Sequence, residues 1–117
     1  MVDVGQIRAF AVALPEVVEQ PHFGRPAFRV RDKLFVSVHA DETPPSIIAH
    51  VSPELAAAEA EVSPESCEEV WRTHGGRDIF VGLRVDLSAT AADRVGELVG
   101  QAWRHRAPKR LVTEHDG

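Results

Sequence analysis

Side chains that could hold a metal ion or move protons are present in this chain but widely spaced. Six histidines occur, and no two of them stand four residues apart, the spacing that lets two imidazoles on one helix face bind one zinc ion. His39 and His50 could meet across neighbouring strands with Asp41 beside them, but surface histidines explain this pattern more simply. We therefore expect no metal site.

Nucleophilic chemistry has equally little support. Cys67 is the only cysteine, which excludes an internal disulfide and a cysteine-based zinc site. With His74 it could form a nucleophile and base, but a half-buried structural thiol is the simpler interpretation. No serine stands in a nucleophile elbow, and the glycines lack the spacing of a phosphate-binding loop. We expect a protein that is not an enzyme and carries no cofactor.

The charge of the chain is unevenly distributed. The formal net charge is −5, whereas proteins that bind nucleic acid usually have a basic balance, because neutralising phosphates supplies most of their affinity. Residues 40–69 carry eight acidic side chains and no Lys or Arg, which we interpret as a solvated helix face and not as a cation site. Residues 22–39 carry four basic side chains against one acid. A local basic patch therefore remains as a candidate surface.

The length of 117 residues corresponds to one domain, since domains most often run roughly 100–150 residues. Its apolar stretches are far shorter than the about 20 residues that span a bilayer, and no secretory signal is visible. We therefore expect a cytoplasmic protein with no membrane partner. We expect residues 1–112 to form the single domain and residues 113–117 to form a disordered tail.

Hydrophobic periodicity predicts helices near both ends of the chain and strands between them. Asp3 is the expected N-cap of the first helix, Ser52 of a middle helix and Thr90 of the last. Strands are expected over 27–31, 33–39, 47–51 and, in two parts, 67–85, where Gly75-Gly76 makes the turn. Tight turns imply antiparallel pairing. The predicted fold is a two-layer α+β sandwich, with an antiparallel sheet of about five strands and the N- and C-terminal helices packed on one face.

Strand alternation assigns one set of side chains to the sheet face opposite the helices. Two phenylalanines among arginines and histidines are uncommon on a solvated face. They could stack nucleic-acid bases, form a protein contact such as a homodimer, or be covered by loops as a second small core. The residues of this possible interaction face are Phe35, His39, Phe80 and Arg84.

Three segments resemble the signature of the MmcQ/YjbR family: Pro21 to Val30 with Lys33-Leu34-Phe35, then Ile79 to Leu83, then Ala102-Trp103 with Ala107 to Leu111. The resemblance implies a CyaY-like fold and DNA binding through a "double wing" of β-hairpins, with wings at 27–39 and 70–84. The motif residues are His22, Phe23, Gly24, Pro26, Phe28, Trp103 and Pro108. The implied DNA contacts are Arg25, Arg29, Arg31, Lys33, Arg72, Arg77, Lys109 and Arg110.

Local physics offers a structural alternative for the same signature. The turn around Gly24 and the segment after Pro108 could pack together to fix the chain ends, with Arg25 bonding helix-terminal carbonyls. The leading hypothesis is a small binding protein that contacts DNA through the first hairpin, weakly, with salt sensitivity and little sequence preference. The rival hypothesis is a protein-interaction module or homodimer that uses Phe35 and Phe80.

Overall fold

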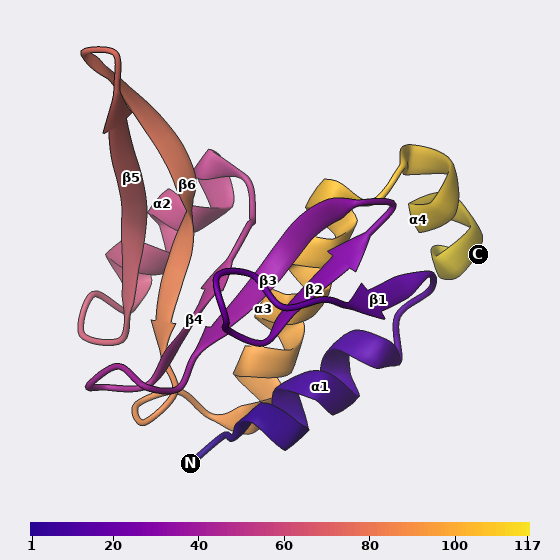
Figure 1. The fold of residues 1–117 in the computed structure, drawn as a ribbon, viewed down its shortest axis with the longest axis horizontal. Coiled ribbons are helices and arrows are strands. Elements are labelled where there is room, and N and C mark those ends of the chain that lie inside the picture. Colours follow the sequence, from indigo (N-terminus) through magenta and orange to yellow (C-terminus); the bar gives the residue numbers. More distant parts are fainter.

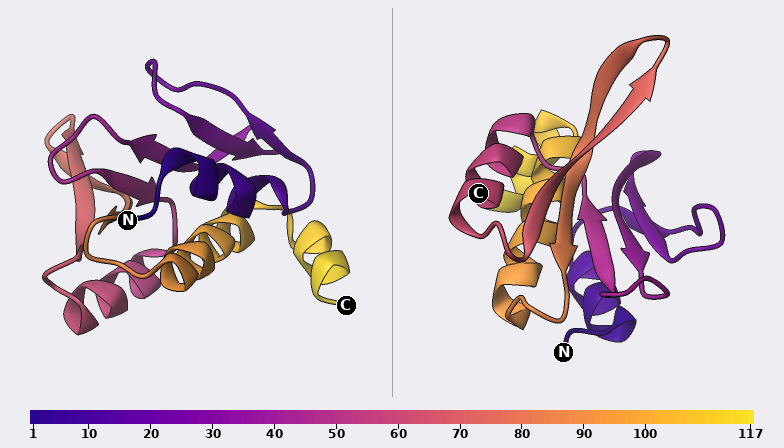
Figure 2. Two further views of the ribbon diagram at one scale, coloured as in Figure 1. Left: turned by 90° about the horizontal axis from the view of Figure 1, so that it is seen from below. Right: turned by 90° about the vertical axis from the view of Figure 1, so that its left-hand side faces the viewer.

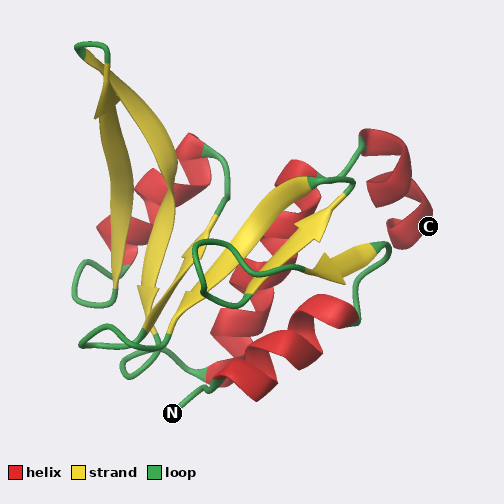
Figure 3. Cartoon of the chain, viewed as in Figure 1, coloured by secondary structure: helices red, strands yellow, loops and turns green.

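The computed structural model describes residues 1–117 and contains four helices and six strands (Figure 1, Figure 3). In chain order the elements are α1 (Val4–Val12), β1 (Val17–Glu19), β2 (Ala27–Val30), β3 (Lys33–His39), β4 (Ser46–Ala49), α2 (Pro53–Val62), β5 (Cys67–His74), β6 (Arg77–Asp86), α3 (Ala92–Arg106) and α4 (Lys109–Asp116).

The strands form one antiparallel sheet in the order β1-β2-β3-β4-β6-β5. Helices α2 and α3 cover one face, and α1 packs beside α3 (Figure 2). The loop of residues 20–26 lies on the opposite side of the sheet (Figure 2). The α+β prediction with antiparallel pairing is confirmed. None of the four helices combines the length and apolar character needed to cross a membrane.

Helix starts follow local capping chemistry in two of the three predicted cases. The Asp3 carboxylate accepts from the Gln6 backbone amide at 2.9 Å, and the Gln6 side chain accepts from the Asp3 amide. Ser52 accepts from the Leu55 amide at 3.2 Å, also as predicted. Thr90 is not the N-cap of α3, because its hydroxyl instead donates to the Asp86 carbonyl.

Both ends of the chain carry an element that the periodicity did not predict. Strand β1 has only three residues, too few to show alternation, and pairs with β2 to make six strands where about five were expected. Residues 113–116, predicted as a disordered tail, continue α4. That helix is held by the buried side chain of Leu111 and by the pair between Arg104 and Asp116 at 2.5 Å.

Phe35 lies in the core and not on the open face, which corrects the prediction from alternation. Its side chain is 0% exposed. A β-bulge is the reason: Phe28 pairs with Val36 and Arg29 pairs with Leu34, so Phe35 is an extra residue with no partner on β2. Such an insertion shifts the alternation by one residue. Phe35 and Val36 therefore both enter the core, while Leu34 becomes half-buried.

The other three residues of the predicted open face are also less accessible than expected. Phe80 is half-buried and packs against the core. A second bulge leaves Val81, the next residue of β6, without a partner on β5. His39 is buried, and Arg84 is half-buried. The predicted second small core is not present, because Phe35 belongs to the one hydrophobic core and Phe80 packs against it.

Candidate nucleic-acid interface

The outer half of the β5–β6 hairpin projects from the globule as a two-stranded ribbon (Figure 1). From Trp71 to Ile79 every residue is exposed, and we call residues 71–79 the ribbon. Its turn has positive φ at Gly75 and Gly76, 58° and 75°, which glycine adopts without strain. The Thr73 hydroxyl donates to Asp78 at 3.1 Å across the strands. The sequence prediction of this turn is confirmed.

An aromatic pair joins the base of the ribbon to the core. The rings of Trp71 and Phe80 are opposite each other in the register and meet edge to face, with centroids 5.3 Å apart. Phe80 packs against the core, whereas Trp71 is 52% exposed. The ribbon is therefore joined to the core at its base and leaves the Trp71 side chain half-exposed to solvent.

Arg72 and Arg77 are exposed on the ribbon, and no carboxylate lies within 4.0 Å of either guanidinium. The same is true of Lys33, at the start of β3, and of Lys109, at the start of α4. Strands β3 and β6 run in the same direction and β5 runs against β6, so Lys33, Arg77 and Arg72 lie toward one end of the sheet; Lys109 begins the helix that follows α3. We call these four residues the cationic end.

His50 lies among these positive charges. Its pKa is lowered to about 4, mainly by burial and next by the charge of Arg106, with smaller contributions from His22 and Arg72. Burial also lowers the pKa of His105, with Arg106 and Lys33 adding to the shift. Arg106, at the end of α3, acts on both imidazoles, whereas Lys33 acts on His105 and Arg72 on His50.

The remaining predicted contacts are already engaged within the protein. Arg25 makes two 3.3 Å hydrogen bonds to Asp41, and Arg31 makes a two-bond ion pair with Glu16. Arg110 pairs with Glu114 one helical turn away at 3.3 Å. These charges are neutralised, so the first hairpin is a weaker candidate than its four basic residues suggested.

Arg29 is also withdrawn from solvent. Its side chain is half-buried, and one amine group donates to the Asp32 carbonyl at 3.3 Å. The Nε atom is buried without a hydrogen-bond partner. Of the eight predicted contacts, the structure thus leaves four as free cations: Lys33, Arg72, Arg77 and Lys109.

The family signature begins with a tight turn, His22 to Arg25. The His22 amide donates to the Arg25 carbonyl at 2.9 Å, and the Arg25 amide donates back at 3.1 Å. Positive φ at both central residues, 52° at Phe23 and 76° at Gly24, makes this a type I′ turn. The Arg25 side chain reaches carboxylates and not helix-terminal carbonyls, so that part of the structural alternative is wrong.

The other motif residues have structural positions. Phe28 and Trp103 are fully buried, and the indole Nε1 of Trp103 donates to the Pro15 carbonyl at 3.1 Å. The Pro26 carbonyl accepts from the Val38 amide at 2.8 Å, and Pro108 precedes α4. These residues join segments distant in sequence, which explains their presence without a ligand.

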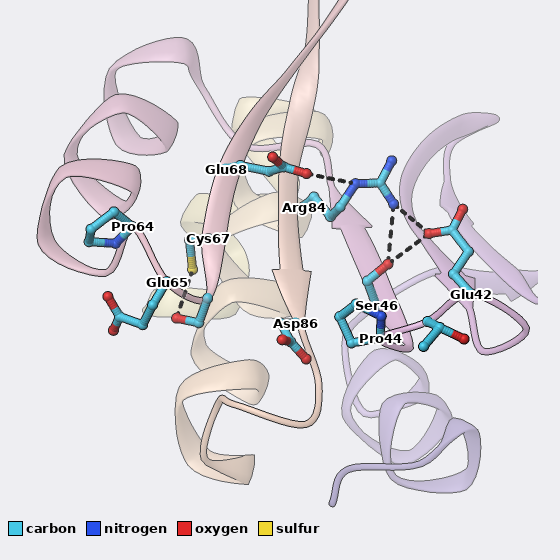
Figure 4. A pocket seen from close by; sticks show the side chains of 11 residues that line it. Glu42, Pro44, Ser46, Pro64, Glu65, Cys67, Glu68, Arg84 and Asp86 are labelled. Atoms are coloured by element: carbon cyan, nitrogen blue, oxygen red, sulfur yellow. Dashed lines mark hydrogen bonds and ion pairs between the residues drawn. The ribbon is translucent and has the colours of Figure 1, made fainter.

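The opposite end of the sheet is acidic and contains a surface pocket of about 560 Å³ (Figure 4). Arg84 crosses it, 2.6 Å from the Glu42 carboxylate and 3.3 Å from that of Glu68, and donates to the Ser46 hydroxyl. Glu65 and Asp86 also line the pocket. Because Arg84 is already paired, the pocket retains a net negative charge and does not suit an anion.

Histidine and cysteine positions give no metal or nucleophilic centre. His39 pairs with Ser46 and His50 follows Ala49, so the two histidines lie at opposite ends of the β3–β4 pair. No group of three or more His, Cys, Asp or Glu side chains is arranged to hold a metal ion. Cys67 is buried, and burial raises its thiol pKa, which keeps it protonated.

Comparison with known proteins identifies the family. A family model described as YjbR matches residues 12–105. The chain belongs to the YjbR family. The crystal structure of Deinococcus radiodurans protein DR2400, with the domain DUF419, matches it with a TM-score of 0.70 and 19% identity. That match covers 88% of this chain and 77% of that chain. At this identity the likeness shows the fold alone. No curated protein matches.

Trp71, His50 and Arg106 were not among the nucleic-acid contacts predicted from sequence, although His50 was considered there as a metal ligand with His39. Trp71 carried a usable signal, because a tryptophan beside an arginine in an exposed hairpin is a known stacking pattern. His50 and Arg106 carried none, because they meet only through the packing of α3 against β4.

Proposed function

We propose that this YjbR-family protein is a cytoplasmic, non-enzymatic binding protein that contacts nucleic acid, DNA included, through its cationic end. The observation that carries the proposal is the collection of unpaired cations beside an exposed indole on a projecting ribbon. Such cations attract phosphates, and an indole face can stack on a base. The site therefore moves from the first hairpin, expected from sequence, to the ribbon and its neighbours.

The shape and charge of the molecule support this role. A two-stranded ribbon is narrow enough for the major groove of B-DNA, which is about 12 Å wide. The acidic pocket lies at the other end of the sheet, so a polyanion is directed toward the ribbon and away from the pocket. Few free side chains can read base edges, so binding should be weak and largely indifferent to sequence.

Fluorescence anisotropy with a labelled mixed-sequence oligonucleotide tests the proposal at low and high salt. The double variant Arg72→Ala/Arg77→Ala should weaken binding and reduce the slope of log K against log salt by about 2, one for each lost phosphate contact. Arg8→Ala is the matched control, because Arg8 is exposed on α1 and paired with Glu19. Absence of binding by the wild type at low salt contradicts the proposal.

A second candidate function, self-association, is favoured by one observation. Strand β5 forms an edge of the sheet, has eight residues and contains neither proline nor lysine, which commonly protect edges. An antiparallel copy centred on Val70 would place Glu68 opposite Arg72 twice, a self-complementary arrangement. This replaces the predicted dimer through Phe35, whose burial removes it from any surface.

Sedimentation velocity over a range of protein concentrations tests self-association. Arg72→Glu should abolish a dimer, since it places two carboxylates opposite each other, and Glu68→Lys/Arg72→Glu should restore it. Arg77 on β6 lies outside this paired edge, so Arg77→Ala should affect only nucleic-acid binding. A wild type that stays monomeric at every concentration removes this candidate.

A further inference from the structure

Arg106 is a charged side chain that the fold withdraws from solvent without giving it an acceptor. It lies in the last turn of α3 and is half-buried, and no carboxylate lies within 4.0 Å of its guanidinium. Its Nε atom is buried and makes no hydrogen bond. The one polar contact of the guanidinium is between Nη2 and the Nδ1 atom of His50, at 3.3 Å.

That contact does not satisfy the guanidinium, because Nδ1 of His50 is itself a donor. This nitrogen lies 2.9 Å from the Val81 carbonyl oxygen, which can only accept, so Nδ1 carries the proton. Two N–H groups therefore face each other where the end of α3 meets β4 and β6. Withdrawing a charge from water without an acceptor costs free energy, and proteins rarely leave such a group unpaired.

The other arginines show that the missing acceptor is particular to Arg106. Seven of the eleven arginines pair with a carboxylate. Arg72 and Arg77 are exposed, so water can solvate them. Arg29 is half-buried like Arg106, but it donates to the Asp32 carbonyl. Arg106 is thus the only arginine that is both withdrawn from solvent and without an oxygen acceptor.

The surroundings of Arg106 favour an anion. Lys109 begins α4 three residues further along the chain. The His50 backbone amide donates to the Phe35 carbonyl at 2.9 Å, which places the imidazole near the start of β3, where Lys33 lies. The guanidinium therefore lies next to the cationic end, and the field there attracts negative charge.

The guanidinium is also open to a ligand at one nitrogen. Nη1 of Arg106 makes no hydrogen bond, and it is not among the atoms that the fold seals from solvent. Glu54, at the start of α2, acts on the neighbouring His105 but forms no ion pair with Arg106. A water molecule could accept a hydrogen bond from Nη1 but would leave the charge uncompensated. A phosphate oxygen supplies both an acceptor and a negative charge.

We propose that Arg106, with His50 beside it, binds a phosphate group. Nη1 donates to a phosphate oxygen, and the negative charge of the phosphate offsets the positive charge that the fold leaves unpaired. A free phosphate and a phosphodiester of nucleic acid present the same oxygens. The inference rests on the proposed function only if the phosphate belongs to nucleic acid.

The test measures thermal unfolding at pH 7 with increasing inorganic phosphate, while sodium chloride is adjusted to keep the ionic strength constant. At a tenfold excess over its Kd, phosphate should raise the Tm of the wild type by about 6 °C, and the rise should saturate. Arg106→Met keeps an unbranched apolar stem but removes the charge, so it should lose this rise. Arg94→Met is the matched control, because Arg94 lies on the same helix and pairs with Glu59 and Glu97. An equal rise in the wild type and Arg106→Met overturns the inference.

A second measurement needs no variant and covers the case in which Arg106→Met does not fold. In ¹H–¹⁵N spectra of the wild type, inorganic phosphate should shift the Arg106 Nε–H signal and the Ala107 amide along one saturating curve. The Arg94 Nε–H signal should stay in place, since that guanidinium is already paired. Signals of Arg106 and Ala107 that do not move overturn the inference.

Anisotropy with the oligonucleotide of the proposed function identifies the source of the phosphate. If Arg106→Met lowers the slope of log K against log salt by about 1, the site binds a backbone phosphate; an unchanged slope means that it binds free phosphate. Saturable stabilisation by phosphate without any oligonucleotide binding supports the site and overturns the proposed function. Oligonucleotide binding that depends on Arg72 and Arg77, without an effect of phosphate on Arg106, overturns this inference alone.

Discussion

The Nδ1 atom of His50 lies 2.9 Å from the carbonyl oxygen of Val81, across the β4–β6 pair. A carbonyl only accepts, so this nitrogen carries the proton. The Arg106 guanidinium is 3.3 Å from the same nitrogen, which then has no lone pair to offer. Two donors therefore meet, and protonating the other nitrogen of His50 would add a second buried positive charge.

This relationship predicts a loss of stability on mild acidification. The pKa of His50 is about 4 in the fold and about 6.5 in an unfolded chain. Between these values the unfolded state binds more protons, so stability falls as the pH falls through that window, by up to about 3 kcal/mol. Urea unfolding at pH 7 and pH 5 measures the change. His50→Gln should reduce the change in the free energy of unfolding between pH 7 and pH 5. An unchanged difference contradicts the attribution of this effect to His50.

The carboxylates of the ion pairs affect stability in a lower pH window than His50 does. Arg25 holds the pKa of Asp41 below its usual value, and Arg104 does the same for Asp116. Their stabilisation is present above the unfolded pKa and is lost as the pH falls below about 4. Measuring the free energy of unfolding of the wild type and of Asp41→Asn in this lower pH window separates the contribution of these carboxylates from that of His50.

Phe35→Ala should destabilise the fold by about 3–5 kcal/mol, because it removes a fully buried ring from the core. Phe23→Ala serves as the matched substitution, since the Phe23 ring is exposed and should contribute little to stability. Chemical denaturation of both variants tests the difference. Equal and small losses of stability in the two variants would mean that Phe35 lies on the open face, as strand alternation predicted.

Gly82→Ala should destabilise the pairing of β4 with β6 by about 1–3 kcal/mol. A Cβ atom at Gly82 would lie 2.6 Å from the Ala49 carbonyl oxygen, which is backbone and cannot rotate away. Gly100→Ala is the control: nothing lies within 4 Å of the added atom, and alanine in α3 should stabilise by up to about 1 kcal/mol. Destabilisation of both variants alike would contradict this contact.

Trp71 should account for the quenchable tryptophan emission of the protein. The only other tryptophan, Trp103, is fully buried with its indole nitrogen bonded. Iodide should therefore quench the wild type and have little effect on Trp71→Phe. Strong quenching in that variant would mean that Trp103 is accessible and that α3 does not pack as described.

Sequence alone was sufficient where a feature depends on neighbouring residues. The caps at Asp3 and Ser52, the Gly75-Gly76 turn and the antiparallel α+β class all follow from local hydrogen bonding and side-chain periodicity. The family signature was also readable, and the family model confirms it. Each of these features is largely decided within about a dozen residues, which is why they could be predicted.

Tertiary structure decided which faces are buried and which charges are free. A single extra residue moved the Phe35 ring from the predicted open face into the core, and no periodicity marks a bulge in advance. Arg25 and Arg31 look like Arg72 and Arg77 in sequence, yet the first two meet carboxylates from segments about 15 residues away. Whether a cation is neutralised depends on such distant contacts, and these exist only once the strands have taken their register.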